Sequence, residues 1–317
     1  MNPTSRLPAL VLVLVGGLSL WPSTVLAGDR DIGPVAAAAD IVEGRKVALV
    51  VGNGAYQHVE RVDQAPKDAK LIADTLKGLG FEVKSYTDLE HRSLSRVAAD
   101  FDAQLEGAAV GFFYYAGHGV QVDGHNYLVP VDAQISGEQY VESEAVDVTK
   151  VLQSMDRAHS RLNVVVLDAC RNNPFAGQWA AKGRSVTTSG LAGVDVAPRG
   201  SVIAYATAPG WVAADDGVYA RSLATHLKEP GAEITDVFRL VYQDVQGASK
   251  SGQSPWYTES RNPGRFYAAG VPVIAKKLAA AHAVAPPKKK SLPTLIQPAV
   301  PTTTRARDAG ATQYILT

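Results

Sequence analysis

The fold is decided by the stretch Val110-Gly-Phe-Phe-Tyr-Tyr-Ala-Gly-His118-Gly119, an apolar run that ends in a histidine between two glycines. A second run of the same kind, Leu162-Asn-Val-Val-Val-Leu-Asp168-Ala-Cys170, ends in the only cysteine of the sequence. Continuous apolar runs rich in valine and aromatic residues are typical of strands buried in a parallel sheet. The carboxyl ends of neighbouring parallel strands meet at one edge of the sheet. We therefore expect His118 and Cys170 to lie close together, as a base and a nucleophile.

The segments around these runs alternate between strand and helix patterns. We expect strands at 45–52, 81–86, 109–115, 162–167, 201–206 and 265–268, helices at 65–79, 93–105, 146–155 and 234–245, and a hairpin at 121–132. Ser93 is the expected cap of the second helix. Such alternation builds right-handed βαβ units. The sequence predicts an α/β fold, a three-layer α-β-α sandwich with a mostly parallel central sheet of about six strands and helices on both faces.

Composition divides the chain into four parts. Residues 1–27 have the pattern of a secretory signal peptide, with an apolar run that is shorter than the roughly 20 residues an anchor helix needs. Residues 28–44 form a lead-in segment and 45–270 the predicted domain. Residues 271–317 are rich in Pro, Lys and Thr and are expected to be a flexible tail. We therefore expect an exported protein, periplasmic or secreted, with no membrane span after signal cleavage.

Charge and motifs exclude several classes of function. The 31 basic and 31 acidic residues balance, which argues against a nucleic-acid-binding role. The sequence has neither a Gly-x-Ser-x-Gly elbow nor a phosphate loop, and Gly52-Asn-Gly54 is only a partial dinucleotide motif. The histidines other than His118 lack the paired spacing of metal ligands, and no EF-hand loop is found. We therefore expect neither a metal site nor a cofactor.

The lone cysteine is informative in an exported protein. An oxidising compartment favours disulfides, but one cysteine cannot form a disulfide within its own chain. A buried cysteine that acts as a small hydrophobic residue is the common alternative. Cys170 follows the apolar run and stands between Asp168 and Arg171, so its polar surroundings favour a reactive thiol.

The two motifs resemble those of caspase-like cysteine peptidases. Tyr115-Ala-Gly-His118-Gly119 precedes Asp168-Ala-Cys170-Arg171 by about fifty positions, an interval found in that family. The variant is similar to bacterial caspase-domain proteins related to metacaspases and paracaspases, which have the caspase-haemoglobinase fold. Further matching stretches are Ala48–Tyr56, Asn126–Asp132, Ala204–Gly210 and Gln253–Trp256, so the resemblance covers residues 45–268.

The resemblance implies a cysteine endopeptidase with a His118/Cys170 dyad. An imidazole beside a thiol favours the thiolate, which is the nucleophilic form, and can later protonate the leaving amine. By the same resemblance, the backbone N–H groups of Gly119 and Cys170 form the oxyanion hole. Some metacaspases use calcium, so activation by calcium stays open.

The residue two positions before the cysteine predicts substrate choice. Caspases carry glutamine there, in a pocket that receives aspartate, whereas this chain carries Asp168. A carboxylate repels an acidic side chain and pairs with Arg or Lys. Asp68 matches a second acidic pocket position of the metacaspases. The predicted substrate is a protein or peptide with Arg or Lys before the cleaved bond. A carboxylate that only accepts backbone hydrogen bonds is the alternative for Asp168.

Two questions stay open at this stage. Lys182 and Arg184 follow Cys170 in a predicted long loop, where they are either sites of self-cleavage or solvated charges. The alternative to a peptidase is a catalytically weak binding or scaffolding module of the cell envelope. Retention of His118 and Cys170 favours the peptidase, since a binding module has no chemical need for a free thiol.

Overall fold

The central sheet is assembled from strands that lie far apart in the sequence. The computed structural model describes residues 41–170, 173–181, 198–207, 216–248, 253–260 and 263–272, with Cys170 described by its backbone. Its strands are β1 (Lys46–Gly52), β2 (Glu82–Thr87), β3 (Val110–Val122), β4 (His125–Leu128), β5 (Val146–Asp147), β6 (Leu162–Cys170), β7 (Ser201–Tyr205) and β8 (Trp256–Glu259). The main path runs β2-β1-β3-β6-β7-β8, and β4 and β5 branch from β3. The first five strands of this path are parallel, and β8 pairs antiparallel with β7.

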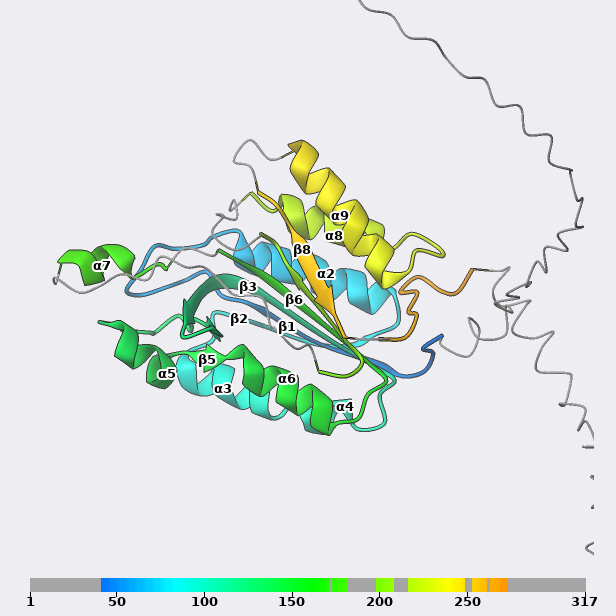
Figure 1. The fold of residues 1–317 in the computed structure, drawn as a ribbon, viewed down its shortest axis with the longest axis horizontal. Helices are drawn as coiled ribbons and strands as arrows, with labels where there is room; N and C mark the ends of the chain where they lie inside the picture. Colours follow the sequence, from blue (N-terminus) through cyan, green and yellow to red (C-terminus); the bar gives the residue numbers. More distant parts are fainter. Residues whose placement is uncertain are drawn as a thin grey trace, which may run out of the picture.

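Helices cover both faces of this sheet (Figure 1). One face carries α2 (Ala65–Gly78), α8 (Val218–His226) and α9 (Ile234–Ala248), and the opposite face carries α3 (His91–Ala99), α4 (Phe101–Leu105) and α6 (Val148–Arg157). Shorter helical pieces are η1 (Glu138–Tyr140), α5 (Val141–Glu144) and α7 (Ala176–Ala181). The layers confirm the predicted three-layer α/β fold with a mostly parallel sheet.

Each buried strand supplies side chains to both layers, because successive residues of a strand point to opposite faces. In β3, Phe112 and Tyr114 belong to the core beneath α2, α8 and α9, whereas Phe113 and Tyr115 belong to the core beneath α3, α4 and α6. All four rings are fully buried. The apolar run of β3 therefore reflects burial on both faces, as predicted, and it aims two adjacent tyrosines at different parts of the molecule.

β3 continues past the point where the sequence suggested an end. Its parallel pairing with β1 stops at Ala116 and its pairing with β6 stops at His118, after which it forms an antiparallel hairpin with β4. The hairpin turns at Asp123 and Gly124, both with positive φ. The hairpin prediction is confirmed, but His118 lies within a strand, at the point where that strand leaves the main sheet.

Several predicted elements are wrong in detail. The last strand is β8 at 256–259, while residues 265–268 contribute only isolated bridges, to Ile41 and Glu233. The helix predicted from Ser93 begins at His91 and breaks at Asp100, and Ser93 is not its cap. Residues 146–147 form β5, which pairs with β4, and α6 begins at Val148, two residues later than predicted, with the Asp147 carboxylate accepting the Thr149 N–H as its cap.

Some predictions concern parts of the chain that the structure leaves undescribed. The signal peptide at 1–27, most of the lead-in segment and tail residues 273–317 lie outside the described residues. Within the described ranges, no helix has the length and apolar character needed to cross a membrane.

Candidate active site

The sheet register places the two predicted reactive residues side by side. His118 of β3 and Cys170 of β6 are direct partners in the last pair of the parallel β3–β6 ladder. Strands that are paired in this way lie about 4.8 Å apart. Two residues that are 52 positions apart in the sequence thus meet at the carboxyl end of the sheet. Asp168, two residues before Cys170, lies on the same strand opposite Ala116.

Gly117 allows the histidine backbone to approach Tyr56. Its φ is +144°, and a Cβ at this position would lie 2.5 Å from the Tyr56 hydroxyl and 2.8 Å from the carbonyl oxygen of Asn53. The backbone N–H of His118 donates to that hydroxyl at 2.7 Å, and the centroids of the Tyr56 and His118 rings lie 4.5 Å apart. The glycine before the histidine is therefore required by both conformation and space.

The backbone of His118 is also held from the opposite face of the sheet. The Tyr115 hydroxyl lies 2.8 Å from the carbonyl oxygen of His118 and 2.9 Å from that of Val129, so its one proton is shared between the two acceptors. The Val129 N–H donates to the same His118 carbonyl at 3.1 Å. These bonds fix the peptide that carries the histidine before any substrate is bound.

The imidazole of His118 is oriented by a main-chain oxygen. Its Nε2 lies 2.7 Å from the carbonyl oxygen of Glu60, and because a carbonyl only accepts, Nε2 carries the proton. In the neutral ring this leaves Nδ1 as an acceptor, and Nδ1 is buried with no hydrogen-bond partner among the described residues. Burial lowers the pKa of His118, and the Glu60 carbonyl opposes this effect only in part. The site therefore favours a neutral imidazole with Nδ1 as its basic nitrogen.

Gly119 has a backbone N–H that the β3–β4 hairpin does not use. The bond from Val129 N–H to the His118 carbonyl is the type that flanks a non-hydrogen-bonded pair in an antiparallel ladder. Gly119 and Leu128 form that pair. Their N–H groups therefore point away from each other, and the Gly119 N–H is directed toward the β6 edge of β3, where the ladder with β6 ends at His118 and Cys170.

An acidic cluster lies beside this edge. The Tyr114 hydroxyl donates to Oδ2 of Asp168 at 2.7 Å. Asp68, buried in the first turn of α2, accepts a 2.8 Å hydrogen bond from Nε2 of Gln64. Burial raises the pKa of Tyr114 well above its usual value, and the charges of Asp168 and Asp68 raise it further. Both carboxylates predicted from the sequence therefore act on one buried hydroxyl.

Two glycines bring α2 and α8 close to this cluster. A Cβ on Gly52 would lie 2.5 Å from Cβ of Ala69, so the glycine lets α2 pack directly against the end of β1. Gly217, with φ +66°, precedes α8, and a Cβ there would lie 2.8 Å from Oδ1 of Asp68. That same added Cβ on Gly217 would lie 2.8 Å from Nη1 of Arg221. The first turn of α8 therefore packs against the Asp68 carboxylate.

Comparison with known proteins identifies the family. A family model described as Caspase domain matches residues 45–267, most of the chain. The chain belongs to the caspase-domain family. The human mucosa-associated lymphoid tissue lymphoma translocation protein 1 and its mouse homologue are each 32% identical over 126 residues. That match covers 40% of this chain but only 15% of each relative.

A solved structure shows the same fold. The Drosophila initiator caspase Dronc superposes with a TM-score of 0.53 at 16% sequence identity, over 82% of this chain and 96% of that chain. Together these matches confirm the resemblance to caspase-like cysteine peptidases that the sequence motifs indicated.

The caspase domain brings most of the predicted site residues together. His118, Gly119 and Cys170 meet where β3 and β6 end their pairing, and Asp168 lies two residues away on β6. Asp68 joins them from α2 through its effect on Tyr114. Lys182 and Arg184 lie outside the described residues.

Three residues of the site were not singled out from the sequence. Glu60 contributes through its main-chain carbonyl, which any residue could supply, so no side-chain pattern reveals it. Tyr56 lies in a stretch that matched the family, but its hydroxyl contact depends on the fold. Tyr114 lies inside an apolar run, where a tyrosine is easily taken for packing alone.

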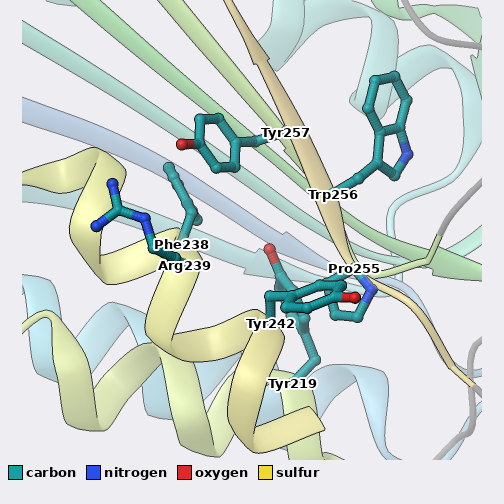
Figure 2. Close-up of a pocket in the computed structure, with 7 residues that line it drawn as sticks. All are labelled: Tyr219, Phe238, Arg239, Tyr242, Pro255, Trp256 and Tyr257. Carbon is teal, nitrogen blue, oxygen red and sulfur yellow. The ribbon is translucent and has the colours of Figure 1, made fainter. Parts of the chain in front are cut away.

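A separate hollow lies at the β8 edge of the sheet (Figure 2). Its volume is about 280 Å³, and it lies between α9 and β8, with Phe238, Tyr242 and Tyr257 among its lining. Tyr219 lines it from α8, beside Tyr242 and Pro255. Burial raises the pKa of Tyr219, and the Asp168 charge raises it further, so this ring links the hollow to the acidic cluster.

Across the described residues, no cluster of three or more His, Cys, Asp and Glu side chains could hold a metal ion.

Proposed function

We propose that this caspase-domain protein is an exported cysteine endopeptidase that cleaves peptide bonds after Arg or Lys. The observation that carries the proposal is the register of β3 on β6, which pairs His118 with Cys170 and places Asp168 two residues before the nucleophile. The predicted signal peptide at 1–27 supports export, and proteins or peptides outside the cytoplasm are then the substrates.

The chemistry follows from the state of His118. Nδ1 accepts the Cys170 thiol proton, and the sulfur attacks the scissile carbonyl carbon to form a tetrahedral oxyanion. The N–H groups of Gly119 and Cys170 stabilise that oxyanion. The imidazolium returns the proton to the leaving amine, so the C–N bond breaks and a thioester remains. Water then attacks the thioester, and its proton passes through His118 to restore the thiol. The Glu60 carbonyl holds the ring in position throughout.

The acidic cluster supports selection of a basic side chain. Asp168 and Asp68 carry the same charge and both lie close to Tyr114, so an aspartate side chain entering this region would meet like charges. A guanidinium or an ammonium instead gains charge-assisted hydrogen bonds. We assign the larger part of the selection to Asp168, because it lies on β6 only two residues before Cys170, whereas Asp68 lies on α2.

The test is hydrolysis of fluorogenic peptides that differ only in the residue before the cleaved bond: Arg, Lys, citrulline or Asp. We expect residues 28–317 to cleave after Arg and Lys and not after Asp, and the Cys170→Ala variant to lose at least about 10³-fold in rate. Assays with and without calcium cover activation by that ion. Cleavage after Asp would reject the specificity, and absence of cleavage with a slowly alkylated Cys170 would favour a binding module.

The matched variant for specificity is Asp168→Asn, which removes the charge and keeps the shape. We expect kcat/KM for the Arg peptide to fall about 10²-fold, because a charged partner in a desolvated site loses its counter-ion. Citrulline has the shape of Arg without the charge, so its kcat/KM should change little. Equal losses on both peptides would mean that Asp168 supports the fold of β6 rather than the choice of substrate.

A further inference from the structure

Tyr114 occupies an unusual position for a core residue. It lies in the middle of β3, is fully buried, and faces the layer of α2, α8 and α9. A buried tyrosine hydroxyl needs a hydrogen-bond partner, and here the partner is the carboxylate of Asp168, 2.7 Å away. The neighbouring Tyr115 points to the opposite face and bonds the His118 carbonyl instead. Tyr114 and Tyr115, which are adjacent on β3, thus bond the Asp168 carboxylate and the His118 backbone, respectively.

The Tyr114 hydroxyl is a permanent donor. Burial raises the pKa of Tyr114 far above its ordinary value, and the nearby charges of Asp168 and Asp68 oppose its ionisation further. It therefore stays protonated throughout the pH range in which a peptidase works. Asp168 therefore keeps this donor on Oδ2, which limits rotation of the carboxylate.

The neutral donor matters because of what a cation would do in its place. A lysine or arginine beside Asp168 would also orient the carboxylate, but it would cancel the charge that attracts a basic substrate. A neutral hydroxyl orients the carboxylate without adding a charge of its own. A tyrosine anchored in the sheet also supplies the hydroxyl at a fixed position, with little side-chain entropy to lose.

We propose that Tyr114 is a specificity-determining positioning residue, whose hydroxyl holds the Asp168 carboxylate in the orientation that receives the Arg or Lys side chain of the substrate. The inference rests on the proposed Arg/Lys specificity and adds to it a residue that acts through Asp168. It assigns Tyr114 to substrate binding and Tyr115 to the alignment of His118.

Tyr219 is another buried tyrosine close to Asp168, and its substitution gives a less selective test. Its ring lines the hollow at the β8 edge (Figure 2), so removing it changes two places at once. Tyr114 does not line that hollow. Loss of its hydroxyl therefore reports on the acidic cluster, in which it donates to Asp168, and does not alter the lining of the hollow.

The experiment compares Tyr114→Phe, Tyr115→Phe and wild type on the Arg peptide and on its citrulline analogue. For Tyr114→Phe we expect KM for the Arg peptide to rise about tenfold, with kcat changed by less than about twofold, since one hydrogen bond to a charged group is lost. Citrulline kinetics should not change. For Tyr115→Phe we expect a fall in kcat on both peptides and no change in their ratio. Tyr140→Phe, at an exposed position, controls for loss of a hydroxyl in general.

A double-mutant cycle separates positioning from general stability. In the Asp168→Asn background, Tyr114→Phe should cause no further loss on the Arg peptide, because the carboxylate on which it acts is absent. An additive loss, or an equal loss on Arg and citrulline peptides in an enzyme with unchanged thermal unfolding, would overturn the role of Tyr114. A wild-type enzyme that prefers citrulline or Asp to Arg would reject the proposed function instead.

Discussion

His118 and His226 are both largely buried, yet their surroundings favour opposite charge states. His118 is 8% exposed, and its ring meets one carbonyl oxygen, at Nε2. The His226 side chain is 12% exposed, and its two nitrogens lie 2.6 Å from Glu229 and 2.8 Å from Asp244. Burial lowers the pKa of both rings. At His226 the two carboxylates outweigh burial and raise its pKa, whereas at His118 the carbonyl and the charge of Glu60 oppose burial without outweighing it.

The difference shows how one residue type serves two purposes. A ring that bonds two carboxylates is a charged cross-link. Through its contact with Asp244, His226 connects the end of α8 to α9, and Asp244 also accepts a hydrogen bond from Ser222. A ring that bonds one carbonyl stays neutral and keeps a basic nitrogen. A catalytic base requires the second arrangement, because a ring held as imidazolium has no lone pair to offer.

The largest expected contrast is in activity. His118→Ala should lower kcat/KM for the Arg peptide about 10³-fold, since it removes the general base, whereas His226→Ala should stay within about threefold of wild type. The alkylation rate of the thiol gives a second readout that needs no substrate, and Cys170 is the only cysteine to modify. The alkylation rate should fall in His118→Ala and stay unchanged in His226→Ala. Comparable losses in both variants would mean that His118 acts on structure and not on the thiol.

A smaller effect is expected in the pH profile. Because burial lowers the pKa of His118 below its ordinary value of 6.5, the neutral base persists as the pH falls to that value. The enzyme should therefore keep more than about half of its plateau kcat/KM at pH 6.5, and the acid limb should lie below that pH. The apparent pKa belongs to the dyad as a whole. An acid limb centred above pH 7 would contradict a neutral, buried imidazole.

The buried strands and their carboxyl ends are the part of the fold that the sequence predicts best. The apolar runs of β1, β3, β6 and β7 are buried on both faces, so their hydrophobic patterns are strong and predict parallel strands. The proximity of His118 and Cys170 follows, because parallel strands bring their carboxyl ends together. The last strand is predicted at 265–268 but is observed at 256–259, because the four residues of β8 are only partly buried and carry little apolar signal.

Features that depend on tertiary contacts were beyond the sequence. α8 begins after Gly217, whose left-handed backbone and close contact with Asp68 exist only once α2 has packed. The Glu60 carbonyl leaves no trace in residue type. The charge states of His118 and His226 are equally hidden, because they depend on burial and, at His226, on carboxylates that the fold brings together. Tyr114 is part of a strand pattern in the sequence, but its hydrogen bond to Asp168 forms only when β3 and β6 are paired.

The smallest expected effect is on stability, and it tests the charged member of the pair. The pKa of His226 is raised in the folded protein, so its contribution is fully present below the unfolded value and is lost as the pH rises through the folded one. His226→Gln should lower the melting temperature by about 2–4 °C at pH 5.5, corresponding to about 1 kcal/mol for a pair whose carboxylates are half exposed. The difference should disappear near pH 9, where the wild-type ring is also neutral. A difference that stays constant with pH would show that His226 contributes by packing, and the contrast with His118 would then rest on geometry alone.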